Sequence, residues 1–462
     1  MRKPLLFIFL FLYSLLAHSQ CWTEISTGGI HSIGIRDGGT LWSWGRNNSG
    51  QLGTGQNSST INLTPKQIGT DSNWSKISAG NAHNLAIKAD GTLWAWGRNS
   101  DGQIGMGSNA SSFNTPQQIG TDTDWACISA GDEFSLAIKT NGTLWAWGDN
   151  LFGQLGDNST DDRNSPVQIG LATNWSTVSA GTQHALGLKT NGELWAWGTN
   201  NTARFSNTLP AFSYTPIQMG SDTDWSKVVA ARDHGVALKT NGTFWTWGSN
   251  ATGQLGDGTT VDKTSPINIA SLNGAVKIAK GHQHTLVIKS DGTIWSWGGN
   301  ASGQLGIGTP LMPAPSPTLN PTQENTLNNT WIYIDSKITH TAAIRSDGSL
   351  YTWGANLWGQ LGDNSQVSKS SPILISCPTL DTDDFDTTEI ITVYPNPASA
   401  TVSIRTGQNF QFSSVKILDL YGKVLFEGNV SEDIHVDHLA SGIYFIQATS
   451  NNQLYQAKFI KN

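Results

Sequence analysis

The sequence predicts an all-β protein made of seven similar units, followed by a smaller β-rich region. The phrase Asp/Asn-Gly-Thr-Leu-Trp-x-Trp-Gly, looser in the last copy, ends at seven glycines spaced 50 to 56 residues apart: Gly45, Gly97, Gly148, Gly198, Gly248, Gly298 and Gly354. Repetition at such a period is typical of a solenoid, a propeller or a tandem array. The 50 glycines, 20 tryptophans and 13% charged residues favour turn-rich strands over helices.

Each phrase forms half of a predicted β-hairpin. The dipeptide Asp90-Gly91, like its equivalents, predicts a tight type I′ turn in which both central residues have positive φ. After the turn, Leu93 faces one side of the strand, whereas Trp94 and Trp96 face the other. Large aromatic side chains on one face of a strand require another sheet to pack against them.

Each unit contains four predicted strands, which we order from a propeller axis outward. The first strand is rich in small residues, as in Ser78-Ala79-Gly80, and such residues suit a crowded axis. The fourth strand is expected to open on a proline, such as Pro116. Because proline cannot donate to a ladder, this strand should form the outer edge of its sheet.

The first 20 residues have the features of a secretory signal peptide. Two basic residues precede an apolar run from Leu5 to Leu16, and Ala17-His18-Ser19 approximates a cleavage site. The apolar run is too short to span a bilayer stably, so we expect no transmembrane segment in the mature chain.

Charge excludes one class of partner. The net charge is -7, and residues 378–390 carry five acidic residues and no basic one. This segment reads as an acidic linker without an apolar pattern. No basic stripe occurs in the chain, so nucleic acid is not an expected partner.

Three short elements recur in register within the units. They are Gly-x-x-His, Trp-Gly-x-Asn and Gly-Gln-Leu-Gly, and the unit from Trp74 to Ile119 shows them nearly complete. Over residues 22–377 these units resemble the repeats of the regulator of chromosome condensation family. The resemblance implies a seven-bladed β-propeller that is closed by pairing strands from the two chain ends. The start of a unit then need not be the start of a blade.

A different pattern begins at residue 391. It contains Tyr394-Pro395-Asn396-Pro397, Tyr421-Gly422-Lys423 and Gly442-Ile443-Tyr444-Phe445, and it ends at Lys458-Phe459-Ile460-Lys461. Short strands with turn signals predict a small Ig-like β-sandwich. The stretch resembles the C-terminal sorting domain of the type IX secretion system of Bacteroidetes. The resemblance implies export across both membranes, with residues 391–462 interacting with the type IX machinery.

The expected organisation is therefore a signal peptide at 1–20, a propeller at 21–377, an acidic linker at 378–390 and a sorting domain at 391–462. We expect a monomer that is secreted or held at the cell surface.

Histidines recur at one place in six units: His31, His83, His184, His234, His284 and His340. One histidine per blade would keep the side chains too far apart for a metal, whose nitrogen ligands lie about 2 Å from the ion. Phe134 fills the place in the third unit, which indicates a packing position. We therefore expect hydrogen-bonded structural histidines.

Acidic loop residues are the other candidate ligands: Asp157, Asp161, Asp162, Asp257, Asp262 and Asp363. They lack the dense alternation of oxygen ligands that a calcium loop requires, so we favour solvated loop acids. No Ser-His-Asp order, paired carboxylates or phosphate-binding loop is evident. The sequence gives no catalytic, metal-binding or cofactor-binding residues.

Two cysteines stand at the ends of the repeat region. In a closed ring Cys21 and Cys377 should meet, and a disulfide would replace the missing peptide link between the first and last units. Such a bridge closes a loop of more than 350 residues, which corresponds to roughly 5 kcal/mol in the chain-entropy treatment. The alternative is unpaired cysteines or a lipidated Cys21, although Gln20 stands where a lipidation site needs a small residue. Cys127 is expected to be a small spacer.

The loops that break the repeat pattern are the candidate binding residues. Alternating strands should place the Gly-x-x-His turns and the Gly-Gln-Leu-Gly loops on one face and the Asp/Asn-Gly turns on the other. On the first face, unit four has Arg204 and Phe205, unit six has Leu311 and Met312, and Trp358 of unit seven joins them. These residue types anchor interfaces. Simple drift of loop sequences is the alternative.

The sequence thus predicts a secreted binding platform for an extracellular protein or glycan, because binding residues reside in loops rather than in the fold. An extracellular enzyme acting on polysaccharides or peptides is the second hypothesis. Guanine-nucleotide exchange, by family analogy, needs a cytoplasmic or nuclear GTPase, and the export signals remove the chain from one.

Overall fold

The computed structural model describes residues 22–56, 61–108, 110–201, 210–312, 315–376, 391–406, 412, 414–419, 424–428, 433–450 and 453–462. The chain divides into two compact units, Met1–Cys377 and Pro378–Asn462. The first contains the repeats, and the second contains the C-terminal strands.

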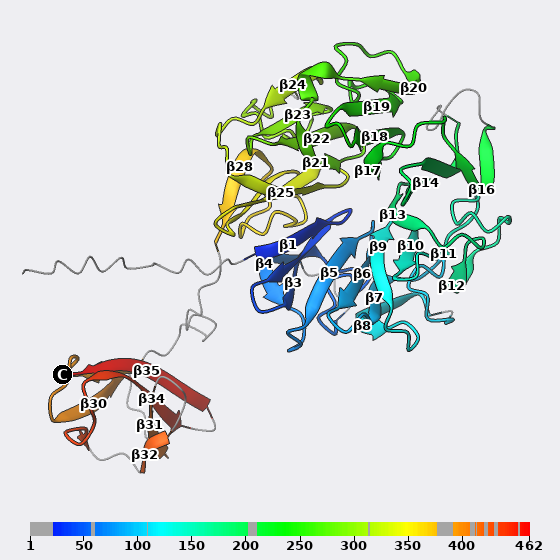
Figure 1. Ribbon diagram of the computed structural model, residues 1–462. Helices are drawn as coiled ribbons and strands as arrows, with labels where there is room; N and C mark the ends of the chain where they lie inside the picture. Colours follow the sequence, from blue (N-terminus) through cyan, green and yellow to red (C-terminus); the bar gives the residue numbers. More distant parts are fainter. Residues whose placement is uncertain are drawn as a thin grey trace, which may run out of the picture. The chain divides into compact units, whose positions relative to one another are not determined.

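The first unit is a propeller of seven four-stranded antiparallel blades (Figure 1). Blade one comprises β1 (Trp22–Thr27), β2 (His31–Arg36), β3 (Thr40–Arg46) and β4 (Ile61–Gln67). The next three are β5–β8 (Trp74–Ala79, His83–Lys88, Leu93–Arg98, Ser112–Gln118), β9–β12 (Trp125–Ala130, Phe134–Lys139, Leu144–Gly148, Arg163–Gln168) and β13–β16 (Trp175–Ala180, His184–Lys189, Leu194–Thr199, Phe212–Gln218). The last three are β17–β20 (Trp225–Ala230, His234–Lys239, Phe244–Gly248, Lys263–Asn268), β21–β24 (Ala275–Lys280, His284–Lys289, Ile294–Gly298, Thr318–Gln323) and β25–β28 (Trp331–Ser336, His340–Arg345, Leu350–Gly354, Lys369–Ile375). A short 3-10 helix, Ala270–Leu272, links blades five and six.

Strand order within a blade follows the chain. The first strands contact the first strands of the neighbouring blades, as β1 does with β5 and β5 with β9, so they line the axis. The fourth strands lie at the outer edges, as expected. In Figure 1, β25 of blade seven returns to lie beside β1 of blade one, and these two strands are in contact.

The expected strand exchange at the chain ends is wrong for the strands that the structure describes. Each of the seven sheets contains four consecutive strands, and none of them takes a strand from another blade. Blades therefore coincide with the sequence units, and side-by-side packing closes the ring.

The Asp/Asn-Gly turns are three-residue loops and not the expected type I′ turns. The amide of Lys88 donates to the carbonyl of Thr92 at 3.1 Å, so Ala89, Asp90 and Gly91 form the loop. In this loop only Gly91 has positive φ, at 81°. Asp90 Oδ1 accepts hydrogen bonds from the amide and the hydroxyl of Thr92 at 3.0 and 2.6 Å. The acidic residue thus fixes the turn through its side chain, while glycine supplies the left-handed position.

The prolines of the fourth strands lie inside the strand rather than at its start. Pro116 is the fifth residue of β8, and the pairing register opposite it shifts between Ala95 and Gly97. A proline fits there because an irregular edge strand needs no ladder bond from it.

Adjacent blades bury their two unlike faces against each other. The tryptophan face of blade two, with Trp74 and Trp96, packs on Ile33, Leu41 and Ile68 of blade one. Trp96 is fully buried and meets Trp74 edge to face, with ring centroids 6.3 Å apart. Complete burial of such a side chain contributes roughly 1.5–3 kcal/mol, so these contacts hold the disc together.

In five of the seven seams, as far as the structure describes them, one glutamine carbonyl accepts two hydrogen bonds from the next blade. The Gln51 carbonyl of blade one accepts the Trp96 indole at 3.0 Å and the Asn84 side-chain amide at 2.7 Å, both from blade two. His31 of blade one contacts the same Asn84 at 2.8 Å through Nε2. The Gly-Gln-Leu-Gly loop of one blade is therefore a structural element of the next seam.

The same contacts close the ring between blades seven and one. The Gln360 carbonyl accepts the Trp44 indole and the Ser32 hydroxyl, each at 2.9 Å. Asp335 Oδ2 accepts the amide of Thr27 at 2.6 Å and its hydroxyl at 2.9 Å. Cys21 and Cys377, the predicted disulfide, lie outside the described residues, and the described Cys127 is a free thiol.

The second unit is a small β-sandwich, as predicted. One sheet has the order β29 (Ile391–Tyr394), β30 (Thr401–Thr406) and β33 (Ile434–His435). The other has the order β32 (Val424–Gly428), β31 (Ser414–Leu418), β34 (Gly442–Ser450) and β35 (Gln453–Lys461). Asn396 of the Tyr-Pro-Asn-Pro motif accepts the Ile460 amide at 2.9 Å through Oδ1, so this motif docks on the C-terminal strand.

Candidate functional site

The two propeller faces carry different segments, in the arrangement expected from the strand order. Turns between first and second strands and loops between third and fourth strands share one face, where Arg98 N donates to Ala82 O at 2.9 Å. We call this the loop face. The Asp/Asn-Gly turns and the links between blades share the other, where Ala89 N donates to Asn73 O at 2.8 Å. We call this the turn face.

The structure describes three of the five predicted binding residues. Met312 is 86% exposed, and Leu311 beside it is partly buried. Trp358 is partly buried, and the Arg46 guanidinium of blade one lies 4.0 Å from its ring centroid. Arg204 and Phe205 lie outside the described residues.

Sequence reasoning missed a second pair of apolar loop residues. Leu151 and Phe152 stand at the same steps after Gly148 as Leu357 and Trp358 after Gly354. Leu151 is 66% and Leu357 64% exposed. In the other units whose loops are described, small or polar residues occupy these steps: Asn48-Ser49, Ser100-Asp101, Ala251-Thr252 and Ala301-Ser302. Aligning the units on the Trp-Gly step would have revealed this difference.

A neighbouring side chain contacts the aromatic ring of each of these two pairs. Phe152 stacks on Phe212 with ring centroids 6.4 Å apart and ring planes 9° apart. Trp358 is held by Arg46, as described above. The loop face thus has two rigid sites, one at blade three and one at blade seven, each with an exposed leucine beside a supported aromatic ring.

Buried asparagines hold these loops in shape. Asn150 Nδ2 donates to Asp157 Oδ1 at 3.0 Å, and the Ser159 hydroxyl donates to the same oxygen at 2.8 Å. Arg163 pairs with Asp157 Oδ2 at 2.6 Å. Asn250 and Asn356 make equivalent bonds to Asp257 and Asp363. The expectation of solvated acids is therefore wrong for these aspartates, which organise the loops, and a basic side chain already neutralises Asp157.

The recurring histidines connect blades, as expected for structural residues. His83 Nε2 lies 3.1 Å from the Ser135 hydroxyl of the next blade, and His340 Nε2 lies 3.1 Å from the Ser32 hydroxyl across the closing seam. Both rings are fully buried. Burial lowers the pKa of each to about 3, so both imidazoles are neutral at physiological pH.

Two lysines near the axis were not anticipated. Lys337 Nζ donates to the carbonyls of Ala79, Ala130 and Gly131 at 3.0, 3.2 and 3.1 Å. Lys280 Nζ donates to the carbonyls of Ala180, at 2.6 Å, and Ala230. Burial and the nearby charge of Lys337 lower the pKa of Lys280 to about 7. Lys280 of blade six thus binds blades four and five, and Lys337 of blade seven binds blades two and three.

The described residues contain no group of three or more His, Cys, Asp or Glu side chains arranged to hold a metal ion. The described histidine and lysine clusters are engaged in blade-to-blade contacts. The exposed loop residues are the candidate binding groups of the described surface.

Comparison with known families identifies the repeats. The profile of the RCC1-like domain matches residues 114–394, more than half of the chain. The chain belongs to the RCC1-like domain family. Profiles of the regulator of chromosome condensation (RCC1) repeat also match this RCC1-like chain at residues 38–87, 22–51 and 74–103. The secretion system C-terminal sorting domain matches residues 392–462, which confirms the predicted resemblance and implies secretion to the cell surface or the extracellular space.

Similar curated proteins share parts of the RCC1-like region. The probable E3 ubiquitin-protein ligase HERC6 of Homo sapiens is 36% identical over 28% of this chain and 13% of its own length. Protein RCC2 of Homo sapiens is 37% identical over 32% of this chain and 28% of its own. The ultraviolet-B receptor UVR8 of Arabidopsis thaliana is 30% identical over 30% of this chain and 32% of its own. The chain spans less than a third of each relative.

Solved structures agree on the fold. Human WBSCR16 superposes with a TM-score of 0.65 at 21% identity, over 73% of this chain and 95% of that one. Yeast RCC1 (Prp20) bound to Kap60 superposes with a TM-score of 0.66 at 19% identity, over 82% and 88%. In the described residues of this RCC1-like protein, no helix has the length and hydropathy of a membrane span.

Proposed function

We propose that this protein is a secreted binding platform whose loop face docks an extracellular protein. The signal peptide at residues 1–20 would carry the chain to the periplasm, and the type IX machinery would recognise the sorting domain. The observation that supports the docking role is the pair of equivalent loop sites at Leu151–Phe152 and Leu357–Trp358. Met312 belongs to the same face, and Arg204 and Phe205, which lie outside the described residues, remain predicted binding residues.

A protein fits this face better than a glycan. The exposed groups are leucine and methionine side chains beside Phe152 and Trp358, and Arg46 backs one of the rings. Aromatic residues, Met and Arg are enriched in protein interfaces, and few residues carry most of the binding energy. Because each ring is fixed by stacking or by a cation–π contact before binding, little side-chain entropy is lost on association.

The docking site is tested by capture from the cell surface. Crosslinking with the purified protein should recover a specific protein, and Leu151→Ser combined with Leu357→Ser should weaken its binding about tenfold or more. Leu171→Ser is the matched control, since Leu171 is 92% exposed on the turn face. Equal binding by the double variant and the control, or recovery of a glycan instead of a protein, would contradict the proposed surface.

The export route is tested separately. Deleting residues 391–462 should leave a folded propeller in the periplasm, because the sorting domain would no longer engage the outer-membrane step. Immunoblots of periplasm, cell surface and medium measure the distribution. Normal release of the shortened chain would disprove this part of the proposal without affecting the docking site.

A further inference from the structure

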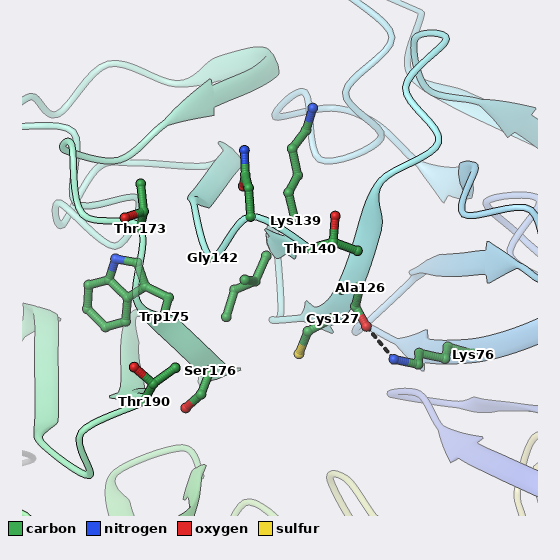
Figure 2. Close-up of a pocket in the computed structure, with 12 residues that line it drawn as sticks. Lys76, Ala126, Cys127, Lys139, Thr140, Gly142, Thr173, Trp175, Ser176 and Thr190 are labelled. Atoms are coloured by element: carbon green, nitrogen blue, oxygen red, sulfur yellow. Dashed lines mark hydrogen bonds between the residues drawn. The ribbon is translucent and has the colours of Figure 1, made fainter.

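The turn face has an open hollow between blades three and four. It measures about 480 Å³, and Lys76, Cys127, Thr140, Asn141, Thr173, Trp175, Ser176 and Thr190 are among its lining residues. Figure 2 shows Lys76 and Ala126 on one side of it and Trp175, Ser176 and Thr190 on the other. A second hollow of about 440 Å³ follows between blades four and five and shares Ser176 and Thr190 with the first.

Five lining residues of the first hollow can both donate and accept hydrogen bonds through their side chains: Thr140, Asn141, Thr173, Ser176 and Thr190. Thr140, Thr173 and Thr190 are exposed, and in the described part of the chain no protein group bonds to their hydroxyls. Asn141 uses its Oδ1 for the turn, accepting from Thr143, which leaves its amide N–H groups available. The apolar residues of the lining are recessed: Trp175 is only 4% and Ile138 only 3% exposed, and Ala126 and Cys127 are partly buried. These properties fit a hydroxyl-rich ligand rather than an apolar one.

Lys76 of blade two lines the hollow. Lys227 and Lys277 do not line it, but they occupy the same third position of their first strands in blades five and six, and all three lysines are exposed near the axis. Lys76 and Lys227 each donate to one carbonyl, of Ala126 and Val276, and so keep two of their three donors. Among the described residues none of the three forms an ion pair. The positive charge of Lys277 contributes to lowering the pKa of Lys227, after burial.

The neighbouring acids do not cancel this charge. Glu24 occupies the same ring position in blade one, and burial raises its pKa to about 7. The aspartates nearer the edge of the turn face pair with other lysines, which lie over tryptophan rings: Asp71 with Lys88, Asp122 with Lys139 and Asp222 with Lys239, each at 2.6 Å. Asp124 and Asp224 pair with Lys139 and Lys239 as well, at 3.1 and 3.0 Å. Lys76 therefore keeps its positive charge without an ion-pair partner among the described residues, on a protein whose net charge is -7.

We propose that the hollow between blades three and four binds an acidic glycan. Lys76 binds the carboxylate or sulfate of one sugar, and Thr140, Asn141, Thr173 and Thr190 bind the hydroxyls of that sugar and its neighbour. The second hollow accepts the continuing chain, because it begins at the shared residues Ser176 and Thr190. This site lies on the face opposite the docking loops and does not depend on them.

Affinity electrophoresis of the purified protein tests the site. Gels containing polygalacturonate or dextran sulfate offer a carboxylate or a sulfate on a sugar chain, neutral dextran offers hydroxyls alone, and polyglutamate offers carboxylates without sugars. We expect retardation by one of the two acidic glycans, which identifies the acidic group, and weaker retardation as salt is added. Retardation by neither acidic glycan, equal retardation by neutral dextran, or equal retardation by polyglutamate would overturn the proposal.

Two variants localise the site. Lys76→Gln keeps a donor for the Ala126 carbonyl but removes the charge, and it should weaken glycan binding about tenfold, as expected for a charge-assisted hydrogen bond. Lys66→Gln removes the same charge from the outer strand β4, where Lys66 is exposed and forms no ion pair among the described residues, and should change nothing. Equal effects of the two variants would show that net charge, and not this hollow, determines binding. Thr140→Val with Thr190→Val should weaken binding while the salt dependence persists.

Discussion

The seam between blades seven and one can be compared directly with the seam between blades one and two. The internal seam has the Trp96 indole on the Gln51 carbonyl at 3.0 Å, and the closing seam has the Trp44 indole on the Gln360 carbonyl at 2.9 Å. A peptide link joins the blades at the first seam, whereas the second joins the two ends of the repeats. The ring therefore closes with the same noncovalent contacts that build it.

One hydrogen bond near the axis has a different kind of acceptor in the two seams. At the internal seam the Ala79 amide donates to the Ser26 hydroxyl at 3.0 Å, but at the closing seam the Thr27 amide donates to the Asp335 carboxylate at 2.6 Å. A charged acceptor makes a shorter and stronger bond than a hydroxyl. The seam between the chain ends thus has a stronger hydrogen bond near the axis than the covalently linked one.

Acidification should have the largest effect on both seams. Burial lowers the pKa of His31 to about 4 and that of His83, His234, His284 and His340 to about 3. In the unfolded chain these histidines have a pKa near 6.5. Below about pH 6.5 the unfolded state therefore binds more protons than the folded state. The stabilising contribution of the neutral histidines is fully present above about pH 6.5 and is lost as the pH falls toward 4 for His31 and toward 3 for the other four, by up to about 1.4 kcal/mol per pH unit for each histidine.

Buried carboxyls act in the opposite direction. Burial raises the pKa of Glu24 to about 7 and also raises the pKa of Asp335, Glu133 and Asp149, so their contribution is present at low pH and is lost as the pH rises through each raised pKa. The five histidines act together with Lys280 and Lys337, whose pKa values burial lowers, and these groups outnumber the four carboxyls. Thermal unfolding at pH 7.5, 6 and 5 should show a falling Tm, and hydrogen exchange should show that the Phe134 seam keeps its protection longest. An unchanged Tm at pH 5 would contradict the inference that the buried histidines are neutral in the folded protein.

Removing one tryptophan from each seam should have the next largest effect. Trp44→Ala and Trp96→Ala each delete a fully buried ring, which costs roughly 3–5 kcal/mol. Because no described peptide link spans the closing seam, Trp44→Ala should additionally expose the β1 and β25 amides to local exchange. Equal exchange patterns in the two variants would show that the covalent link between blades one and two contributes little.

Removing hydrogen bonds between the first strands should have the third largest effect on stability. Asp335→Ala leaves the Thr27 amide and the hydroxyls of Ser26 and Thr27 without their acceptor, and should cost roughly 2–4 kcal/mol. Ser78→Ala removes one hydroxyl acceptor, that of the Ala130 amide, and should cost about 1 kcal/mol. Chemical denaturation measures both. If Asp335→Ala lowers the free energy of unfolding less than Ser78→Ala does, the inference of a stronger hydrogen bond at the closing seam is wrong.

The repeated features were predictable from the sequence. Because each strand occurs seven times, the strand order, the tryptophan faces and the structural histidines could be predicted by comparing equivalent residues, such as the small residues of the first strands and the Phe134 that replaces one histidine. The turn type did not, because a dipeptide such as Asp90-Gly91 suits both two-residue and three-residue hairpins, and only the closing bond from Lys88 to Thr92 distinguishes them. The position of the proline within the fourth strand was also predicted wrongly, because no sequence pattern indicates the register shift opposite Pro116.

Features that occur once or twice were harder to predict. Lys280 and Lys337 stand where other units have small residues, and their contacts with carbonyls from other blades depend on ring geometry. The Leu151–Phe152 site was overlooked because these residues look like ordinary loop variation until they are aligned with Leu357–Trp358. The predicted binding residues remain proposals, since exposure alone names no partner.

The smallest expected effect tests why blade three tolerates phenylalanine. Phe134 packs against Ala185, whereas His83 faces Ser135, so the residue across the seam changes with the ring. His83→Phe alone leaves the Ser135 hydroxyl bonded to the Gln103 carbonyl and should cost about 1 kcal/mol. Adding Ser135→Ala recreates the natural Phe134–Ala185 pairing and should recover part of that loss. A double-mutant cycle by chemical denaturation gives the coupling energy, and a coupling of zero would show that the histidine contributes its packing volume and not its hydrogen bond.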